Sequence, residues 1–433
     1  MNENILYGER MSIEVCGGNR VEGSLKIQGS KNAVLPIMAA AILCDEITVI
    51  ENCPDISDVH AMAEVICGAG GETDYRDHCL TINPAGIRNT AIEEERAHEI
   101  RASVLLSGSM LARFGKITID YPGGCSIGSR PIDYHLKSFR QMGVQITEKE
   151  TYICCEVQGH LRGANIRLSF PSVGATENII LAAVLAEGTT EIENAAREPE
   201  IVELCSFLTA MGAVIEGAGT EWIRIRGVSK LHAVKWLLGS DRIALLTYAM
   251  MVAGCGGKAF FETERSFSKI EYKILSRLGC RIEREESGIR VIQDKRPEPV
   301  YYLRTEPYPG FPTDGQSLLM AVLCKSGGVS MIEEGVFENR FRMIRQLRKM
   351  GANIDYVSNR ASITGVTRLH GAIVEADDLR SGAGLLIAAG MADGVTCVTN
   401  EYFIHRGYED IVGQMRALGL DAEYKGKQKK EGN

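Results

Sequence analysis

The stretch "EPEIVELCSFLTAMGAVI" (198–215) decides the fold. Its first 14 residues, 198–211, carry apolar side chains at the spacing of an amphipathic helix, and the run after Gly212 has the β-branched character of a strand. Glycine at such a junction adopts the left-handed backbone conformation that ends a helix, because it has no Cβ to clash. The stretch therefore predicts a helix, a glycine stop and a strand.

The same phrase occurs five more times along the chain. The copies are "GAGGET" (68–73), "QMGVQI" (141–146), "RLGCRI" (277–282), "KMGANI" (349–354) and "ALGLDA" (417–422). The marker glycines are Gly70, Gly143, Gly212, Gly279, Gly351 and Gly419, spaced 67 to 73 residues apart. This period is too long for a solenoid repeat and suits a small module of helices and strands.

Ahead of each glycine lies a second helix that is apolar on nearly every side, as in "NIILAAVLA" (178–186) and "IALLTYAMMVA" (243–253). Such a helix must be buried all round. A β-branched run follows it, as in "EGTTEIENA" (187–195), so each module reads strand, buried helix, strand, amphipathic helix, strands. Six modules in two groups of three predict a two-domain α/β fold with helices inside and sheets outside, divided near "WLLGSDRI" (236–243).

Composition narrows the classes of function. The 433 residues are enough for two domains, and 45% hydrophobic with 24% charged residues is typical of soluble globular proteins. A net charge of -8 argues against nucleic acid or an anionic membrane as the main partner. Apolar runs such as "LPIMAAAIL" (35–43) are shorter than the roughly 20 residues of a spanning helix, and the N-terminus has no leader pattern, which predicts a cytoplasmic protein. The polar tail "YKGKQKKEGN" (424–433) is predicted to be disordered.

Cysteine and histidine spacing favours neither disulfides nor a structural metal. The cysteine number is odd at 13, no C-x-x-C pair occurs, and the eight histidines do not fall at zinc-ligand spacing. Most of the thiols are expected to be reduced and buried.

Two loops lead into buried helices in a way that suits an anion. "QGSKNAVLPIMAAAIL" (28–43) places Lys31 and Asn32 at a helix start, where backbone N–H groups favour phosphate; the alternative is a Ser30 N-cap followed by a solvated lysine. "FPSVGATEN" (170–178) presents Ser172 in the same way, although many helices begin like this.

A third loop, "RTEPYPGFPTDGQS" (304–317), holds three prolines within six residues and delivers Asp314 to a helix start. Asp314 is interpreted as a carboxylate held in place to take a proton, or alternatively as an N-cap.

Five arginines stand at repeat boundaries: Arg101, Arg130, Arg340, Arg380 and Arg406. Singly, such arginines are usually salt bridges at a rim. Gathered in one cleft, they would suit a doubly anionic small substrate.

The segment "YPGGCSIGSRPIDYH" (121–135) places Cys125 after two glycines and five residues before Arg130. Little can pack on this thiol, the arginine would favour the thiolate, and the glycines allow the loop to move as a lid. The other cysteines are expected to be inert.

These phrases, together with "ENAAREPEIV" (193–202), "FENRF" (337–341), "DLRSGA" (378–383) and "HRGYE" (405–409), occur in an order and spacing that resembles the UDP-N-acetylglucosamine 1-carboxyvinyltransferase family of enolpyruvyl transferases. The resemblance spans essentially the whole chain, and its most specific part is the Cys125 loop, since the sister enzymes acting on shikimate 3-phosphate lack that cysteine. It implies an inside-out α/β barrel of two domains, each with three βαβαββ units. The implied N-terminal domain is 31–239; the C-terminal domain combines 1–30 with 240–424, and 425–433 is a disordered tail.

The resemblance also implies the reaction. The enolpyruvyl group of phosphoenolpyruvate passes to the 3-hydroxyl of UDP-N-acetylglucosamine by addition and elimination of phosphate, the first committed step of peptidoglycan synthesis and the target of fosfomycin. It implies no cofactor, no metal, no membrane and no obligate protein partner. Cys125 would protonate the methylene carbon, Asp314 would contact the reacting hydroxyl and Asp378 would assist proton transfer.

The binding residues implied by the motifs form two sets. Phosphoenolpyruvate would be bound by Lys31, Asn32, Arg130, Arg340, Arg380 and Arg406, of which Lys31 and Arg406 also count as catalytic with Cys125, Asp314 and Asp378. The nucleotide sugar would be bound by Arg101, Arg130, Pro131, Ile132, Asp133, Tyr134, Phe170, Pro171, Ser172, Val173, Asp314 and Val336.

Three places depart from the family pattern. Residues 244–246 (Ala-Leu-Leu) lie where the family usually reads Glu-x-Gly-Thr, Tyr308 replaces a usual histidine, and His405 stands where an aspartate is usual. Two alternatives stay open: a transferase of the same fold with another acceptor, and a regulatory paralogue that binds the UDP-sugar. The paralogue predicts loss of Cys125, Lys31 or an arginine of the set, and all are retained.

Overall fold

The computed structural model describes residues 11–92, 104–120 and 132–426. Clustering of contacts along the chain gives two compact units. Unit I comprises the described residues within Met1–Ile27, Arg242–Glu306 and Gly310–Asn433, and unit II comprises those within Gln28–Asp241 and Pro307–Pro309.

Three apolar helices form the centre of each unit. They are α1 (Lys31–Ala41), α4 (Leu106–Phe114) and α6 (Val173–Ala183) in unit II, and α8 (Arg242–Cys255), α10 (Thr313–Leu323) and α12 (Leu379–Met391) in unit I. Within each unit the three helices contact one another. In α8 every residue from Ile243 to Ala253 is buried, which confirms that this helix is enclosed on all sides.

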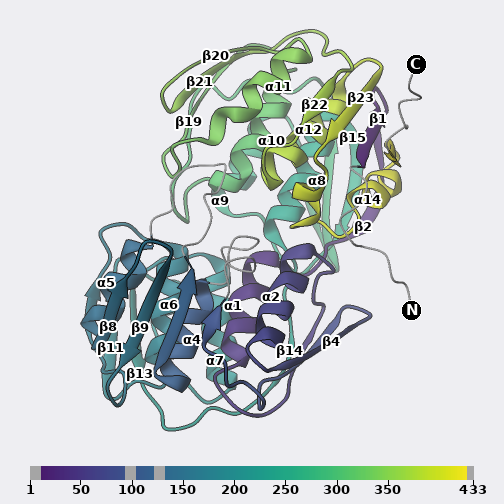
Figure 1. Ribbon diagram of the computed structural model, residues 1–433. Coiled ribbons are helices and arrows are strands. Elements are labelled where there is room, and N and C mark those ends of the chain that lie inside the picture. The colour runs from purple at the N-terminus through teal and green to yellow at the C-terminus, as the bar shows by residue number, and fades with distance from the viewer. Residues whose placement is uncertain (1–10, 93–103, 121–131, 427–433) are drawn as a thin grey trace, which may run out of the picture. The chain divides into compact units, whose positions relative to one another are not determined.

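Sheets lie on the outside of these helices (Figure 1). The described residues form six separate four-stranded sheets, and each has one parallel pair at one edge followed by two antiparallel pairs. Alternating burial in β13 turns Ile223 and Ile225 inward, as expected of a sheet with one face on the core. The α/β class with helices inside is therefore confirmed, although the strands of the described residues form no single closed ladder.

The sheets of unit II contain the following strands in spatial order. They are β14 (Lys235–Leu237), β3 (Thr48–Glu51), β5 (Cys79–Asn83) and β4 (Glu72–Arg76); β6 (Ala91–Ile92), β7 (Lys116–Asp120), β9 (Tyr152–Val157) and β8 (Val144–Glu148); and β10 (Asn165–Arg167), β11 (Thr189–Glu193), β13 (Trp222–Arg226) and β12 (Val214–Glu216).

The sheets of unit I follow the same plan. They are β2 (Val21–Lys26), β15 (Gly257–Glu262), β17 (Gly288–Gln293) and β16 (Arg281–Glu285); β18 (Leu303–Arg304), β19 (Val329–Glu333), β21 (Arg360–Thr364) and β20 (Asn353–Val357); and β22 (Ile373–Glu375), β23 (Val395–Thr399), β1 (Ser12–Cys16) and β24 (Asp421–Lys425).

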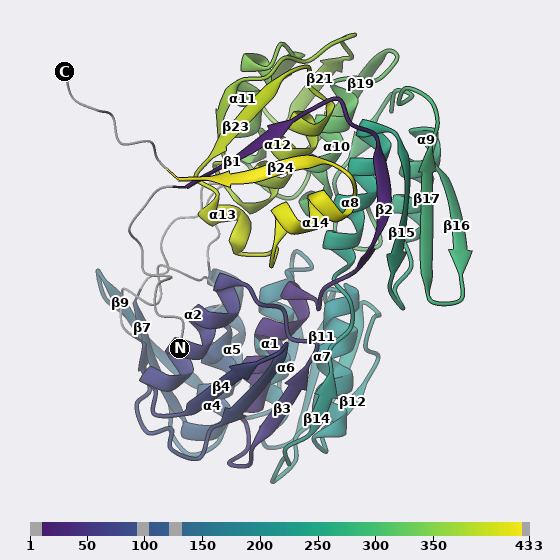
Figure 2. The ribbon, with the colours of Figure 1, turned by 90° about the vertical axis from the view of Figure 1, so that its right-hand side faces the viewer.

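The first and fourth modules do not use the strands that precede them in sequence. Strand β2 comes before α1 but pairs in parallel with β15, while β14 comes before α8 but pairs in parallel with β3. Strand β1 completes the last sheet between β23 and β24, as Figure 2 shows. The chain therefore begins in unit I, enters unit II after Ile27 and returns at Arg242.

An amphipathic helix lies between the strands of each module. These helices are α2 (Ser57–Gly68), α5 (Asp133–Gln141), α7 (Pro199–Ala210), α9 (Lys269–Arg277), α11 (Ile344–Lys349) and α14 (Ile411–Ala417). All six marker glycines follow them with positive φ, between 79° and 107°. After α7, the N–H of Gly212 donates to the carbonyl of Thr209 and that of Ala213 to the carbonyl of Leu208, the pairing that satisfies the last carbonyls of a helix.

Two further findings concern the C-terminal strand and the length of the helices. Lys425 of β24 pairs with Ser12 of β1, and β24 extends through residues 424 and 425. The prediction that the disordered tail begins at 424 or 425 was therefore wrong. Of this tail, residues 427–433 lie outside the described residues. No helix in the described ranges is long and apolar enough to cross a membrane.

Replacing Gly212 tests the repeated helix stop. Its φ is +107° and nothing lies within 4 Å of a Cβ built there, so conformation and not space requires glycine. Gly212→Ala is expected to lower the free energy of unfolding by about 1 kcal/mol, and Gly212→Asn by less because asparagine tolerates the left-handed region. Urea unfolding curves of the two variants measure this, and equal losses for both would contradict the explanation.

Candidate active site

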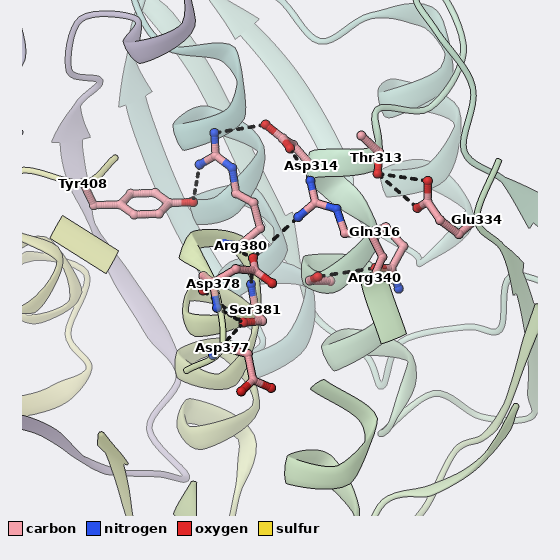
Figure 3. Close-up of polar contacts among 11 residues, drawn as sticks. Thr313, Asp314, Gln316, Glu334, Arg340, Asp377, Asp378, Arg380, Ser381 and Tyr408 are labelled. Carbon is pink, nitrogen blue, oxygen red and sulfur yellow. Dashed lines mark hydrogen bonds and ion pairs between the residues drawn. The ribbon is translucent and has the colours of Figure 1, made fainter. Parts of the chain in front are cut away.

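Two arginines of unit I have buried side chains that contact the same carboxylate (Figure 3). Arg340 begins the 3-10 helix η2 (Arg340–Met343), and Arg380 lies in the first turn of α12; their side chains are 2% and 4% exposed. The alternative of rim salt bridges is wrong for these two, because a guanidinium this deeply buried needs compensating charge and hydrogen bonds.

Asp314 joins the two arginines. Arg340 Nη2 donates to its Oδ1 at 2.7 Å, and Arg380 Nη2 donates to its Oδ2 at 3.3 Å. Pro312 occupies the N-cap position of α10, so the carboxylate of Asp314 lies in the first turn and is not the N-cap. The proline-rich loop thus brings one carboxylate to two cations.

Asp378 supports the pair from the start of α12. Its carboxylate accepts from the backbone N–H groups of Arg380 and Ser381 as the N-cap, and Arg340 Nη1 lies 3.5 Å from its Oδ1. The same side chain therefore caps the start of α12 and helps to orient one guanidinium.

Tyr408 holds the other guanidinium through a chain of hydrogen bonds. Arg380 Nη1 donates to the Tyr408 hydroxyl at 3.1 Å, which lies 2.7 Å from Thr247 Oγ1; Thr247 in turn donates to the carbonyl of Ile243 at 2.8 Å. Because Thr247 uses its proton on that carbonyl, Tyr408 donates to Thr247. Neither residue was named from the sequence, although Tyr408 lies in "HRGYE" and Thr247 in the α8 motif.

Glu334 orders the loop that carries Val336. Its carboxylate accepts from Thr313 Oγ1 at 3.0 Å and from the backbone N–H groups of Val336 and Phe337 at 2.9 and 3.1 Å. The Phe337 ring lies 5.4 Å from the guanidinium carbon of Arg340, a favourable cation–π distance. Val336 is next in sequence to the phenylalanine that contacts Arg340.

Arg406 follows the short helix α13 (Tyr402–His405) in the same unit and is half-buried. Burial lowers the pKa of the neighbouring His405, against a smaller opposing effect of Asp410. The departure at 405 therefore places a histidine that favours its neutral form where the family usually has an aspartate.

The departures at residues 244–246 are buried in α8. Leu246 packs against the start of α10: a Cβ on Gly315 would lie 2.9 Å from its Cδ2, next in sequence to Asp314. The leucine thus packs against the first turn of α10, which carries Asp314. The other departure, Tyr308, donates its backbone N–H to Glu198 Oε1 at 3.3 Å.

In unit II, Lys31 is the first residue of α1 and its side chain is 12% exposed. Its Nζ lies 2.8 Å from Asp58 Oδ2, and its backbone N–H donates to Asp241 Oδ2 at 3.0 Å. The Ser30 side chain makes no cap hydrogen bond, so the alternative of a Ser30 cap with a solvated lysine is wrong. Asn32 is half-buried beside it.

Two other predicted segments of unit II lie next to each other. Ser169 Oγ donates to the Tyr134 hydroxyl at 3.1 Å, which joins the start of α5 (Ile132, Asp133 and Tyr134) to the loop of Phe170, Pro171, Ser172 and Val173. Ser172 caps α6 by accepting from the Ala175 N–H at 3.4 Å. Its hydroxyl is therefore engaged in the helix start.

Arg101, Cys125, Arg130 and Pro131 lie outside the described residues. The structure describes the twelve other cysteines, none of them in a disulfide: six are buried, four half-buried, and Cys16 and Cys67 exposed. Burial raises the pKa values of Cys155, Cys205, Cys255, Cys280 and Cys324 to about 12. Such thiols stay protonated and unreactive near neutral pH.

Glu177 is a buried carboxyl on α6, within the "FPSVGATEN" motif. Burial, with smaller effects of Glu200 and Glu198, raises the pKa of Glu177 well above its ordinary value. The folded chain therefore holds a proton on this group at a pH at which the unfolded chain has lost it.

This difference predicts a pH-dependent effect of Glu177→Gln. The stability contributed by the protonated carboxyl is complete below the unfolded pKa and is lost as pH rises through the raised folded pKa. The variant does not titrate, so its advantage over wild type should grow with pH, by up to about 1.4 kcal/mol per pH unit between the two pKa values. Urea unfolding at several pH values measures it, with Glu216→Gln, at an exposed position, as the control. A difference independent of pH would contradict it.

Comparison with known proteins identifies the family. The family model for EPSP synthase (3-phosphoshikimate 1-carboxyvinyltransferase) matches residues 15–415. UDP-N-acetylglucosamine 1-carboxyvinyltransferase 1 of Halalkalibacterium halodurans is 44% identical over 414 residues, 95% of this chain and 94% of the relative. The UDP-N-acetylglucosamine 1-carboxyvinyltransferase of Finegoldia magna is 43% identical over 417 residues, 95% of this chain and 98% of the relative.

Solved structures show the same fold. The enolpyruvyl transferase NikO from Streptomyces tendae superposes with a TM-score of 0.86 at 24% identity, covering 97% of this chain and all of the other. EPSP synthase from Acinetobacter baumannii gives 0.73 at 18% identity, covering 96% and 100%. The chain belongs to the EPSP synthase family of 1-carboxyvinyltransferases and, within it, to the UDP-N-acetylglucosamine 1-carboxyvinyltransferases.

Proposed function

We propose that this chain transfers the enolpyruvyl group of phosphoenolpyruvate to the 3-hydroxyl of UDP-N-acetylglucosamine and releases phosphate, as the first committed step of peptidoglycan synthesis. The observation that carries the proposal is the buried pair Arg340 and Arg380, which already binds a carboxylate through two terminal nitrogens. Planar guanidinium groups match a carboxylate in this way, and the substrate contains one. The names of the two curated relatives support the acceptor.

Each charged group of phosphoenolpyruvate has its own partners. Arg340 and Arg380 bind the carboxylate, while Lys31, Arg130 and Arg406 bind the phosphate, with Asn32 beside them. The ion pair of Lys31 with Asp58 supports this role, because it holds the ammonium group at the helix start. Cationic side chains around the phosphate stabilise it as it leaves.

The reaction needs one acid and one base. Cys125 donates a proton to the methylene carbon, which makes the adjacent carbon an oxocarbenium-like centre; the 3-hydroxyl oxygen attacks it and gives its proton to Asp314. The tetrahedral adduct then loses phosphate while the Cys125 thiolate takes back one proton from the methyl group, and the enol ether forms. Asp378 assists these proton transfers, and the contact of Arg340 with both aspartates supports their common role.

The nucleotide sugar is bound by Arg101, Arg130, Pro131, Ile132, Asp133, Tyr134, Phe170, Pro171, Ser172, Val173, Asp314 and Val336. The hydrogen bond between Ser169 and Tyr134 supports one surface for the α5 start and the 170–173 loop. Units I and II are then the two enolpyruvyl transferase domains.

We place the enzyme in the cytoplasm, since a free, reactive Cys125 requires a reducing compartment. A block in this step would alter cell shape and division, because peptidoglycan supply would stop.

One observation favours a second acceptor. Leu246 packs against Gly315 beside Asp314, where the family usually has glycine in its Glu-x-Gly-Thr segment. A narrower space beside the acceptor's base would suit a smaller or differently shaped hydroxyl substrate.

Phosphate release tests the proposal directly. Purified protein is given phosphoenolpyruvate with and without UDP-N-acetylglucosamine, and the nucleotide product is weighed by mass spectrometry. Release that requires both substrates, with a product heavier by one enolpyruvyl group, is expected. No release from folded protein would overturn this acceptor, and Leu246→Gly would then test the alternative.

Replacing Cys125 tests the acid. Cys125→Ala should lower kcat by about 10²- to 10⁴-fold without unfolding the protein, and Cys125→Asp should retain part of the activity because a carboxylic acid also donates a proton. Fosfomycin should add its mass to wild type and not to Cys125→Ala. Wild-type turnover in the alanine variant, with an unchanged circular dichroism spectrum, would refute the role.

A further inference from the structure

One carboxylate occupies both arginines of unit I. Asp314 Oδ1 and Oδ2 each accept from a different guanidinium, at 2.7 and 3.3 Å. All four terminal guanidinium nitrogens have a partner: both Nη2 atoms contact Asp314, Arg340 Nη1 lies 3.5 Å from Asp378, and Arg380 Nη1 donates to Tyr408. Asp314 thus takes one N–H from each arginine, the pair of donors that a second carboxylate arriving on the same side would need.

The three partner residues, Asp314, Asp378 and Tyr408, differ in how firmly they are held. Tyr408 is fully buried, and Asp378 is committed to the cap of α12 with a side chain 12% exposed. Asp314 is 26% exposed, the most of the three. Asp314 is therefore the partner that can move away from the arginines. A ligand can reach the two guanidinium groups from the side on which Asp314 lies.

The balance of charge around Arg340 and Arg380 also indicates that a second carboxylate has to displace Asp314. Two guanidinium groups and the carboxylates of Asp314 and Asp378 balance each other at a place where the arginines are almost wholly buried. A third carboxylate on the same arginines would leave one buried negative charge in excess, which is costly in a low-dielectric site.

We propose that Asp314 determines specificity by competing with the substrate carboxylate for Arg340 and Arg380, so that phosphoenolpyruvate displaces it when it binds. The inference rests on the proposed function. Only a ligand that brings its own carboxylate can replace Asp314, and a phosphate without one gains nothing from these arginines. Displacement releases the oxygens of Asp314 from Arg340 and Arg380, so that they can accept the proton of the acceptor hydroxyl. Asp314 therefore becomes available as the base once phosphoenolpyruvate is bound.

A purely structural role for Asp314 predicts the opposite. If the carboxylate only held the two arginines apart and oriented, its removal would leave them less ordered and would weaken the binding of phosphoenolpyruvate. The sign of the change in affinity therefore separates the two roles.

The test is the affinity of Asp314→Asn for two probes, measured by calorimetry without nucleotide sugar. Competition predicts a dissociation constant for phosphoenolpyruvate about tenfold lower than in wild type, since binding no longer has to displace a charge, and a constant for inorganic phosphate within about twofold of wild type. Weaker or unchanged phosphoenolpyruvate binding would overturn the proposal. Equal tightening of both probes would overturn it as well, because that is the effect of removing any nearby negative charge.

Two variants serve as controls. Asp377→Asn removes the same charge one residue from Asp378, but the Asp377 carboxyl points away from both arginines (Figure 3), and phosphoenolpyruvate affinity should change by less than about twofold. Tyr408→Phe removes a hydroxyl that orients Arg380 and carries no charge that could compete with the substrate carboxylate. This variant should weaken phosphoenolpyruvate binding, whereas Asp314→Asn should strengthen it.

A structure of the wild-type protein with phosphoenolpyruvate tests the displacement without any variant. Separation of Asp314 from both Nη2 atoms beyond 4 Å is expected, whereas retention of both contacts would overturn the proposal. Wild-type protein that binds no phosphoenolpyruvate would overturn the proposed function and this inference together. Wild-type binding with a failed Asp314→Asn result overturns the inference alone.

Discussion

A helix that is apolar on every side has to be enclosed on every side, and the architecture of both units follows from this constraint. Three such helices contact one another in each unit, and their remaining apolar surface needs a cover. Sheets with one apolar face solve the problem, because each buries one face against the helices and leaves the other to solvent. The amphipathic helices and their glycine stops return the chain to the next strand each time.

The same packing builds the candidate site. Contacts among α8, α10 and α12 bring together Thr247, Asp314 and Arg380, which lie in or near the first turns of three helices from distant parts of the sequence. First turns have N–H groups without helical partners, so Asp378 can cap α12 with two of them and still orient Arg340. Apolar packing thus sets the positions of charged groups that have little exposure of their own.

Burial explains how the arginines differ from ordinary surface cations. Guanidinium groups at 2% and 4% exposure need both charge and hydrogen-bond partners, and Asp314, Asp378 and Tyr408 supply them. In the proposed reaction binding and catalysis draw on the same partners, so a group that stabilises the buried arginines would also control what can bind them. Leu246 packs on Gly315, the residue after Asp314 in α10, so the apolar core lies directly against the helix turn that carries this group.

The sequence by itself determined the repeated module, because the period of apolar residues and the left-handed glycines are local properties; all six marker glycines have positive φ. It also identified Arg340 and Arg380, because they stand at repeat boundaries, and Asp314, because a proline-rich loop delivers it to a helix start; Asp378 was implied only by the family resemblance. It missed Tyr408 and Thr247, whose hydroxyl groups acquire their meaning only from a neighbour across the core.

Only the tertiary structure decided which strands complete which sheet. Strands β2 and β14 exchange places between the first and fourth modules, and β14 has only three residues, too few to show a pattern. The end of β24 was misjudged for the same reason, because Lys425 is ordered by its pairing with Ser12, more than 400 residues earlier. Strand pairing and charge compensation are long-range interactions, and a pattern of neighbours along the chain carries no information about them.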